Sequence, residues 1–252
     1  MPELYFCRKQ QHRIAGAEIL SGMVRFLVTI AFWCFTSGML QAQTHLQAWF
    51  RTTLSYPLST RLRADSEVQY RRQSGSDNGY IPDKSLMYSF RQWLTYRCDE
   101  QLSLSLSPLA WFTHYKSIDQ PADTLPGLRR EFRVSAATEW RQPVGSKIHI
   151  VYRSAAEYCF MSGATSPAVR LRYRTGLSYA FGKDLRLSLA GETFLHLFRT
   201  DIMDQNRLMV QADYTISRHI RIDPGFVCIS RPRGLNQPSL ALVLFLNLMI
   251  RL

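Results

Sequence analysis

The chain is 252 residues long, and 46% of its residues are hydrophobic, 12% aromatic and 20% charged. Its formal net charge is +12 and its mean hydropathy is −0.16. These values exclude a disordered chain and do not suggest a helical membrane protein, so polar and apolar residues must be patterned within a folded unit. The length fits a single all-β domain.

The first element in chain order is the uncharged apolar run Phe26–Phe35 (FLVTIAFWCF), which follows Arg25 and precedes small and polar residues. A basic residue, a short apolar core and a small residue at Ala42 are typical of a secretory signal peptide, and the run is too short to span a bilayer. We predict a leader over residues 1–42, with Met23 as a candidate true start, and one barrel domain over residues 43–252. The alternative is a buried helix of a soluble protein.

Loss of the leader leaves 27 basic and 17 acidic residues, a net charge of +10. An exported basic protein rarely meets nucleic acid, so we expect anionic lipid headgroups of the outer membrane as partners and no nucleic acid. The remaining cysteines, Cys98, Cys159 and Cys228, are an odd and widely spaced set. They predict packing cysteines without an essential disulfide.

After Gln43 nearly every segment alternates between apolar and polar residues, which is the pattern of a strand with two different faces. Tight turns alternate with longer Gly-, Pro-, Asp- and Ser-containing connections, as in outer-membrane barrels with short periplasmic turns and long external loops. The predicted strands are Leu46–Tyr56, Arg61–Gln73, Leu86–Arg97, Leu102–Thr113, Leu128–Arg141, Lys147–Phe160, Val169–Phe181, Leu185–Phe198, Asn206–Ile216, Ile220–Ile229 and Ser239–Leu252.

The predicted fold is therefore all-β, an antiparallel up-and-down transmembrane barrel of ten to twelve strands behind a signal peptide. Bacterial single-chain barrels normally have an even number of strands. That number would be ten if Leu46–Tyr56 is not a full wall strand, or twelve if one strand escapes the pattern. An interior of this width is largely filled by long side chains, so we expect a narrow or closed lumen.

One face of the strands carries leucines such as Leu102, Leu104 and Leu106, and aromatics about eight positions apart, such as Phe132 and Trp140. We expect this face to meet lipid, because eight tilted residues separate the two aromatic girdles of a barrel. The other face carries both charge signs, which would be costly in hydrocarbon and must line the lumen. The predicted lumen cluster is Arg61, Arg63, Glu67, Arg91, Arg133, Glu139, Arg153, Glu157, Arg170, Arg172, Arg174, Arg186, Glu192, Arg207 and Asp213.

A secreted β-sandwich is the alternative architecture, with the leucine face buried as a core and the arginine face in water. Strands longer than the globular mean of about five or six residues favour the barrel.

The chain also resembles the DUF2490 family of exported barrel proteins of Gram-negative bacteria. The resemblance covers Ala48 to Leu252, and it rests on the order of several pieces: the early Trp49, the strand with Arg153 and Glu157, the segment RLRYR, Glu192 with Phe194, and DQNR at Asp204–Arg207. Tyr158 and Cys159 depart from it, since an Arg or Phe pair is common there. The resemblance implies an outer-membrane barrel of uncharacterised function and supplies no catalytic residues.

Three classes of function remain open. The first is a structural or binding barrel whose loops meet an external ligand or partner. The second is a narrow channel for small anions, suggested by the arginine row Arg170, Arg172 and Arg174 with Arg186. The alternative for that row is a set of rim residues that meet water and lipid phosphate.

The third class is a lipid-modifying enzyme with His149 or His196 as general base. We expect a non-enzymatic protein without cofactor or metal, because no G-x-S-x-G or H-E-x-x-H motif is present and the histidines lack ligand spacing.

Overall fold

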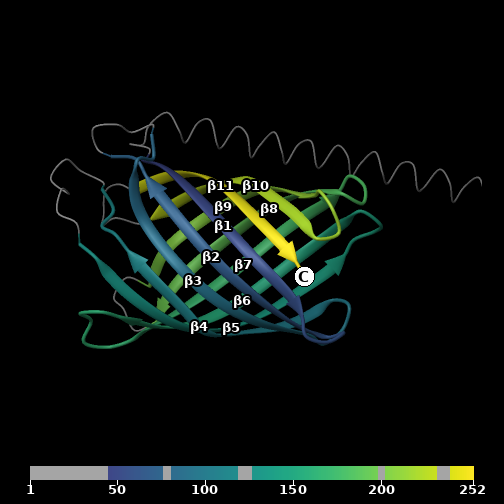
Figure 1. The fold of residues 1–252 in the computed structure, drawn as a ribbon, viewed down its shortest axis with the longest axis horizontal. Helices are drawn as coiled ribbons and strands as arrows, with labels where there is room; N and C mark the ends of the chain where they lie inside the picture. The colour runs from purple at the N-terminus through teal and green to yellow at the C-terminus, as the bar shows by residue number, and fades with distance from the viewer. Residues whose placement is uncertain (1–44, 76–80, 119–126, 198–201, 232–238) are drawn as a thin grey trace, which may run out of the picture. The chain divides into compact units, whose positions relative to one another are not determined.

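The structure is a computed structural model that describes residues 45–75, 81–118, 127–197, 202–231 and 239–252. The predicted leader, residues 1–42, lies outside these residues. The described part folds into eleven strands, which wrap into a closed barrel (Figure 1). They are β1 His45–Pro57, β2 Leu62–Gln73, β3 Lys84–Arg97, β4 Leu102–His114, β5 Arg129–Pro143, β6 Ile148–Met161, β7 Ala168–Ala180, β8 Leu185–Leu197, β9 Met203–Thr215, β10 Ile220–Arg231 and β11 Ser239–Arg251.

The predicted all-β barrel of ten to twelve strands is thus confirmed, and eleven strands are found in the described residues. Neighbours in the chain pair antiparallel, as predicted, but β1 and β11 close the barrel as a parallel pair. The reason is the odd number: strands that alternate in direction bring the first and eleventh to the seam pointing the same way. Leu46–Tyr56 lies in a full wall strand, with partners on both sides in β2 and β11.

The two ends of the barrel differ, as the connections predicted. At the turn end, where the odd-numbered strands finish, the connections are 58–61, 98–101, 144–147, 181–184 and 216–219. In each, the first residue donates its backbone N–H to the carbonyl of the residue that opens the next strand, as Val144 does to Ile148 at 2.8 Å. Gly145 has a φ of 88°, which favours glycine in that turn. The connections at the opposite end, the loop end, are longer.

The outer face is apolar, as predicted. Leu104 and Leu106 are 44% and 47% exposed, which contradicts the sandwich alternative, in which they would form a buried core. Exposed and half-buried aromatics stand side by side across the strands near both ends. Trp111, Phe132 and Phe160 occupy one row toward the loop end. Toward the turn end, Trp140 stacks on Tyr152 with ring centroids 5.5 Å apart.

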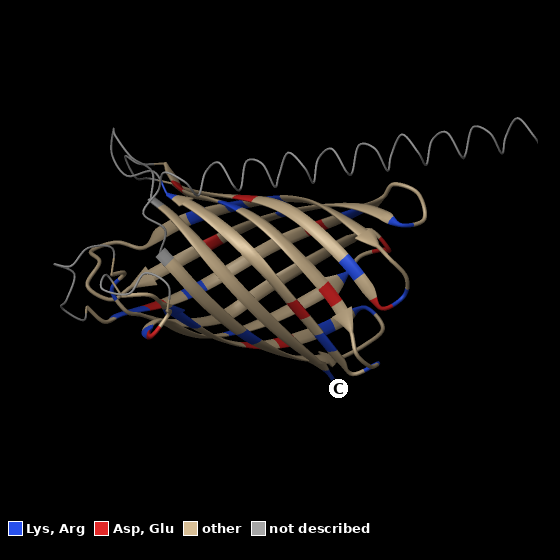
Figure 2. Cartoon of the chain, turned by 90° about the horizontal axis from the view of Figure 1, so that it is seen from above, with Lys and Arg blue, Asp and Glu red and all other residues tan. Residues whose placement is uncertain are grey.

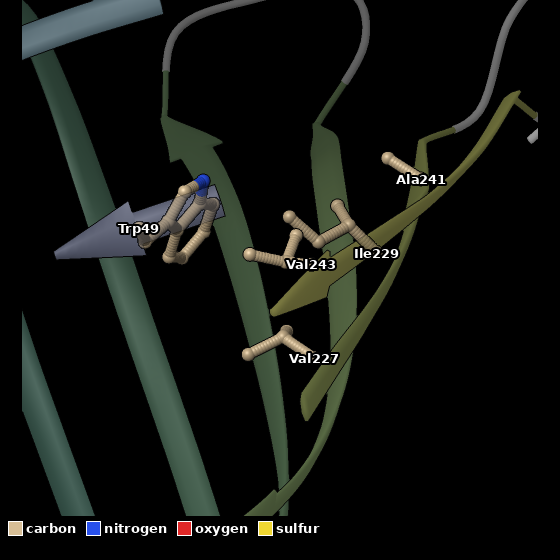
Figure 3. Packing of buried hydrophobic residues seen from close by; sticks show 5 residues of the cluster. All are labelled: Trp49, Val227, Ile229, Ala241 and Val243. Carbon is tan, nitrogen blue, oxygen red and sulfur yellow. The ribbon is translucent and has the colours of Figure 1, made fainter. Parts of the chain in front are cut away.

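Part of the inner face is also apolar, which the sequence pattern did not predict. Figure 3 shows Trp49 of β1, Val227 and Ile229 of β10, and Ala241 and Val243 of β11, with their side chains projecting to the same side of the wall. These five residues are buried, and Met209 and Phe245 pack against them. We call this cluster the apolar seam, because it lies inside the barrel where β1 meets β11.

Candidate functional site in the barrel interior

A cavity of about 590 Å³ lies inside the barrel. Its lining extends from Leu86 and Arg231, near the loop end, to Arg63 and Met249, near the turn end. Figure 2 shows basic and acidic residues along the middle of several strands as well as at their ends. Of the predicted lumen cluster, the cavity is lined by Arg63, Glu67, Arg91, Arg133, Glu139, Arg153, Arg170, Arg172, Arg174, Glu192 and Arg207.

The four other predicted residues are placed differently. Glu157 lies behind the lining and is 1% exposed. Arg186 and Asp213 stand opposite each other on β8 and β9, near the turn end. Arg61 is exposed and lies in the turn 58–61, because β2 begins one residue later, at Leu62, and it is not among the residues that line the cavity.

Glu157 on β6 is surrounded by four arginines. Arg170 donates to it through Nε at 2.9 Å and through Nη2, and Arg172 Nη1 lies 2.9 Å away. Arg91 and Arg133 follow at 3.7 and 3.8 Å. Arg170 faces Glu157 directly in the register of β6 and β7, whereas Arg91 belongs to β3. The carboxylate therefore ties β6 to its neighbours and to a strand that is not adjacent in the sheet.

The network continues from Glu157 in both directions around the wall. Arg133 donates two hydrogen bonds to Glu131, of 2.5 and 2.7 Å, and His114 Nε2 lies 2.7 Å from the same carboxylate. On the other side, Arg172 Nη2 donates to Glu192 at 2.8 Å. Buried carboxylates are stable when charged partners and hydrogen bonds surround them, and these meet that condition. We call the inner face of β5 to β9 the ion-paired wall.

Aromatic rings are interleaved with these arginines. The guanidinium carbon of Arg133 lies 3.8 Å from the ring centroid of Phe112, and those of Arg172 and Arg207 lie 4.7 and 4.3 Å from that of Phe194. Such stacking holds a guanidinium in place through its flat face and leaves its N–H edge free to bind.

The cavity wall carries more positive than negative charge. Among the described residues that line it are eleven arginines and five carboxylates. The buried Glu131 and Glu157, which lie close to the lining, still leave an excess of four positive charges. An interior of this sign attracts anions and disfavours cations.

The two histidines weighed as general bases are not brought together. His149 pairs with Ser178 of β7 in the register, whereas His196 stands opposite Arg170, with its Nε2 3.5 Å from Asp204. In the described part of the chain, no group of three His, Cys, Asp or Glu side chains could hold a metal ion. Cys98, Cys159 and Cys228 are free thiols.

Sequence reasoning missed the aromatic residues of the interior as site residues. Trp49, Trp93 and Phe194 each stand two residues from an inward charged residue of the same strand. The alternation of the strand alone therefore predicts that they face the interior. Phe112 could not be found in that way. A register shift between Ser107 and Ala110 reverses the alternation of β4 and turns Phe112 inward.

The fold and the site define a class of protein: a closed β-barrel with an apolar exterior and an arginine-rich interior cavity. The chain belongs to the family described as "Protein of unknown function (DUF2490)", whose model matches residues 46–232. This confirms the resemblance seen in the sequence. No match is found among curated proteins.

Among solved structures, the chain is similar to an anion-selective porin from Comamonas acidovorans, with 11% sequence identity and a TM-score of 0.37. The similarity covers 76% of this chain and 53% of the porin, so the chain spans about half the porin's length. No helix in the described part of the chain is long and apolar enough to cross a membrane.

Proposed function

We propose that this protein is an outer-membrane β-barrel of a Gram-negative bacterium, exported through the Sec pathway, whose narrow interior admits small anions. One observation carries the proposal: the cavity runs between residues near both strand ends, and its lining together with the adjacent Glu131 and Glu157 has an excess of four positive charges. Clefts lined by one sign of charge concentrate ions of the opposite sign. General porin activity is not proposed, because arginine side chains reduce the interior to about 590 Å³.

The membrane setting is supported by the dimensions and by the outer face. Strands have 12 to 15 residues, and 13 residues at about 3.3 Å each, tilted by about 40°, rise about 33 Å. That height matches the hydrocarbon core of about 30 Å. The exposed leucines and the aromatic rows then face lipid and its headgroups, which makes outer-membrane lipids the partners of this surface.

Two measurements test the proposal. Membrane fractionation with heat-modifiable gel mobility should place the protein in the outer membrane as a species that unfolds only on boiling. In planar bilayers with a salt gradient, the reversal potential should have the sign of anion selectivity. A soluble, heat-insensitive protein would refute the membrane setting, and absence of current above background would refute conduction.

A second candidate, a barrel that binds but does not conduct, is favoured by the ion pairs of Glu157. The ion pair between Arg91 on β3 and Glu157 on β6 crosses the interior between strands that are not adjacent. Side chains that cross the interior in this way would block the lumen. The protein would then act through a bound solute, or through long connections at the loop end that meet an external ligand or protein. A folded, heat-modifiable barrel without current is the result that selects this candidate.

We further propose that the protein is not an enzyme. The placement of His149 and His196 supports this, since His149 faces Ser178 near the turn end, whereas His196 faces Arg170 near the loop end, and the two do not stand together at one site. Replacement of both histidines by alanine should leave the composition of the outer-membrane lipids unchanged. An altered lipid profile in cells carrying the double variant would contradict the proposal.

A further inference from the structure

Arg71 differs from four other arginines of the barrel strands in the residue that stands two positions away on the same face of its strand. Four such pairs join an arginine to a carboxylate: Arg63 to Asp65, Arg133 to Glu131, Arg141 to Glu139 and Arg221 to Asp223. At Arg71 the acceptor is instead the neutral amide of Gln69, whose Oε1 lies 3.0 Å from Nη2. Among the described residues no ion pair within 4.0 Å joins Arg71 to a carboxylate. Its positive charge is therefore not neutralised locally.

Arg207 on β9 repeats this arrangement. The residue two positions before it is also a glutamine, Gln205. Its partner Glu192 is 3.6 Å away and is engaged more closely by Arg172, at 2.8 Å. The buried Nε atoms of Arg71 and Arg207 have no hydrogen-bond partner within the described residues. Buried N–H donors without an acceptor cost free energy, which a bound oxyanion would recover.

The two guanidinium groups meet at one indole ring. The guanidinium carbons of Arg71 and Arg207 lie 3.7 and 5.3 Å from the ring centroid of Trp49. Trp49 stands opposite Arg71 in β2 and opposite Phe245 in β11. The ring therefore joins two partly uncompensated cations to the apolar seam.

The apolar surface beside these cations is open to the cavity. Trp49, Met209, Val227 and Phe245 line it together with Arg71 and Arg207. Met209 and Phe245 also pack against the buried seam residues. One corner of the cavity thus offers guanidinium donors and a hydrocarbon surface to the same occupant.

We propose that this corner, the Trp49 site, binds a small organic anion in which a carboxylate or phosphate group is joined to an apolar group. The oxyanion would bind the free N–H edges of Arg71 and Arg207, since guanidinium forks match planar or tetrahedral oxyanions. The apolar group would lie on Met209 and Phe245, which line the cavity and are only partly buried. This inference rests on the proposal that the interior admits anions, and it names the chemical class of the ligand.

The ligand class is tested by calorimetric titration of the full chain, purified from membranes in detergent, with phenyl phosphate, inorganic phosphate and phenol. Phenyl phosphate should bind at least about tenfold more tightly than either of its halves, because it alone uses both the cations and the apolar surface. Equal affinity for inorganic phosphate and phenyl phosphate would overturn the apolar part of the proposal. Absence of phenyl phosphate binding would overturn the site.

The location is tested by Gln69→Glu, which keeps the shape of the side chain and gives Arg71 the carboxylate that the other four arginines have. The affinity for phenyl phosphate should fall about tenfold or more, because the added carboxylate competes for the guanidinium. Arg63→Gln is the matched control: it changes the interior by the same unit of charge on the same strand, and Arg63 is 48% exposed and paired with Asp65. It should leave the affinity within about threefold.

Met209→Gln tests the apolar half separately. It should lower the affinity for phenyl phosphate and leave that for inorganic phosphate unchanged. Heat-modifiable mobility reports whether each variant is folded, and a variant that does not fold is replaced by Met209→Ser or Gln69→Asp.

The proposed binding site and the proposed anion passage can be refuted independently of each other. Phenyl phosphate binding that Gln69→Glu abolishes, in a barrel without current, supports the site and refutes anion passage. Anion-selective current with binding that Gln69→Glu does not alter supports passage and refutes the site.

Discussion

The ion-paired wall and the apolar seam are two regions of one interior, and they are stabilised in opposite ways. On β5 to β9, the buried carboxylates Glu157 and Glu192 are held by arginines of the adjacent strand β7, and the buried Glu131 is held by Arg133 of its own strand. On β10, β11 and β1, hydrocarbon side chains pack against one another instead. Carboxylates and arginines are closely paired in most of the ion-paired wall, whereas Arg71 on β2 and Arg207 on β9, which meet at the Trp49 ring, are not fully paired with carboxylates. The difference is consistent with our proposals that the ion-paired wall stabilises the barrel and that the Trp49 site binds an anion.

Removal of the central carboxylate, Glu157→Gln, should break the ion-paired wall and give the largest effect. Four arginines would lose their common partner, and loss of one partner from a buried pair costs about 3 to 5 kcal/mol. The melting temperature, followed by heat-modifiable mobility in detergent, should fall strongly. Glu67→Gln is the control, because Glu67 has one arginine at 3.8 Å and is 22% exposed, and loss of such a pair costs about 0 to 1 kcal/mol. Equal melting of the two variants would show that the wall is not held by its central ion pairs.

Truncation of the apolar seam should cost less. Ile229 is fully buried, and Ile→Ala at such a site costs about 2 to 5 kcal/mol, toward the lower end where neighbours can relax into the cavity. Val68→Ala on the outer face, where Val68 is 58% exposed, should change the melting temperature little. If Ile229→Ala lowered the melting temperature no more than Val68→Ala does, the seam would not be a packed cluster.

The seam should also resist added volume. A Cβ at Gly225 would overlap the Phe245 ring and the Val210 carbonyl oxygen, so both the ring and the backbone must shift in Gly225→Ala. Overpacking of this kind costs about 1 to 3 kcal/mol. Gly191→Ala is the matched control, since a Cβ there meets no atom within 4 Å. The comparison of their melting temperatures should show a loss only for Gly225→Ala, and equal losses would contradict the close approach of Phe245.

The sequence predicted the ion-paired wall better than the seam, and the reason is physical. A charged residue at every second position can face only one way in a lipid-facing strand, so Arg170, Arg172 and Arg174 were assigned to the interior from the period alone. In β11 both faces are apolar, as Leu242 and Val243 illustrate. Alternation then carries no information about what lies inside.

Other features depend on geometry that a one-dimensional pattern does not contain. The parallel closure follows from the total number of strands, and the inward position of Phe112 follows from the shift in β4. Arg61 has the parity of the inward residues of β2 but lies in the turn before that strand, so alternation does not fix its position. The unmatched charge of Arg71 depends on where the nearest carboxylates lie in space, since Gln69 on its own is an unremarkable strand residue.

The smallest effect is expected at the turn end, outside the ion-paired wall and the apolar seam. Asp99 Oδ1 accepts the backbone N–H groups of Leu102 and Gln101, each at 2.7 Å, and these hydrogen bonds lower the pKa of the Asp99 carboxyl. A carboxyl whose pKa is lower in the folded state stabilises the fold above its unfolded pKa, near 3.9, and loses that contribution as the pH falls through the folded value. Asp99→Asn should therefore melt slightly below the unchanged protein at pH 7, and the difference should shrink toward zero in strong acid. A difference that does not vary with pH would mean that the charge of Asp99 does not stabilise this turn.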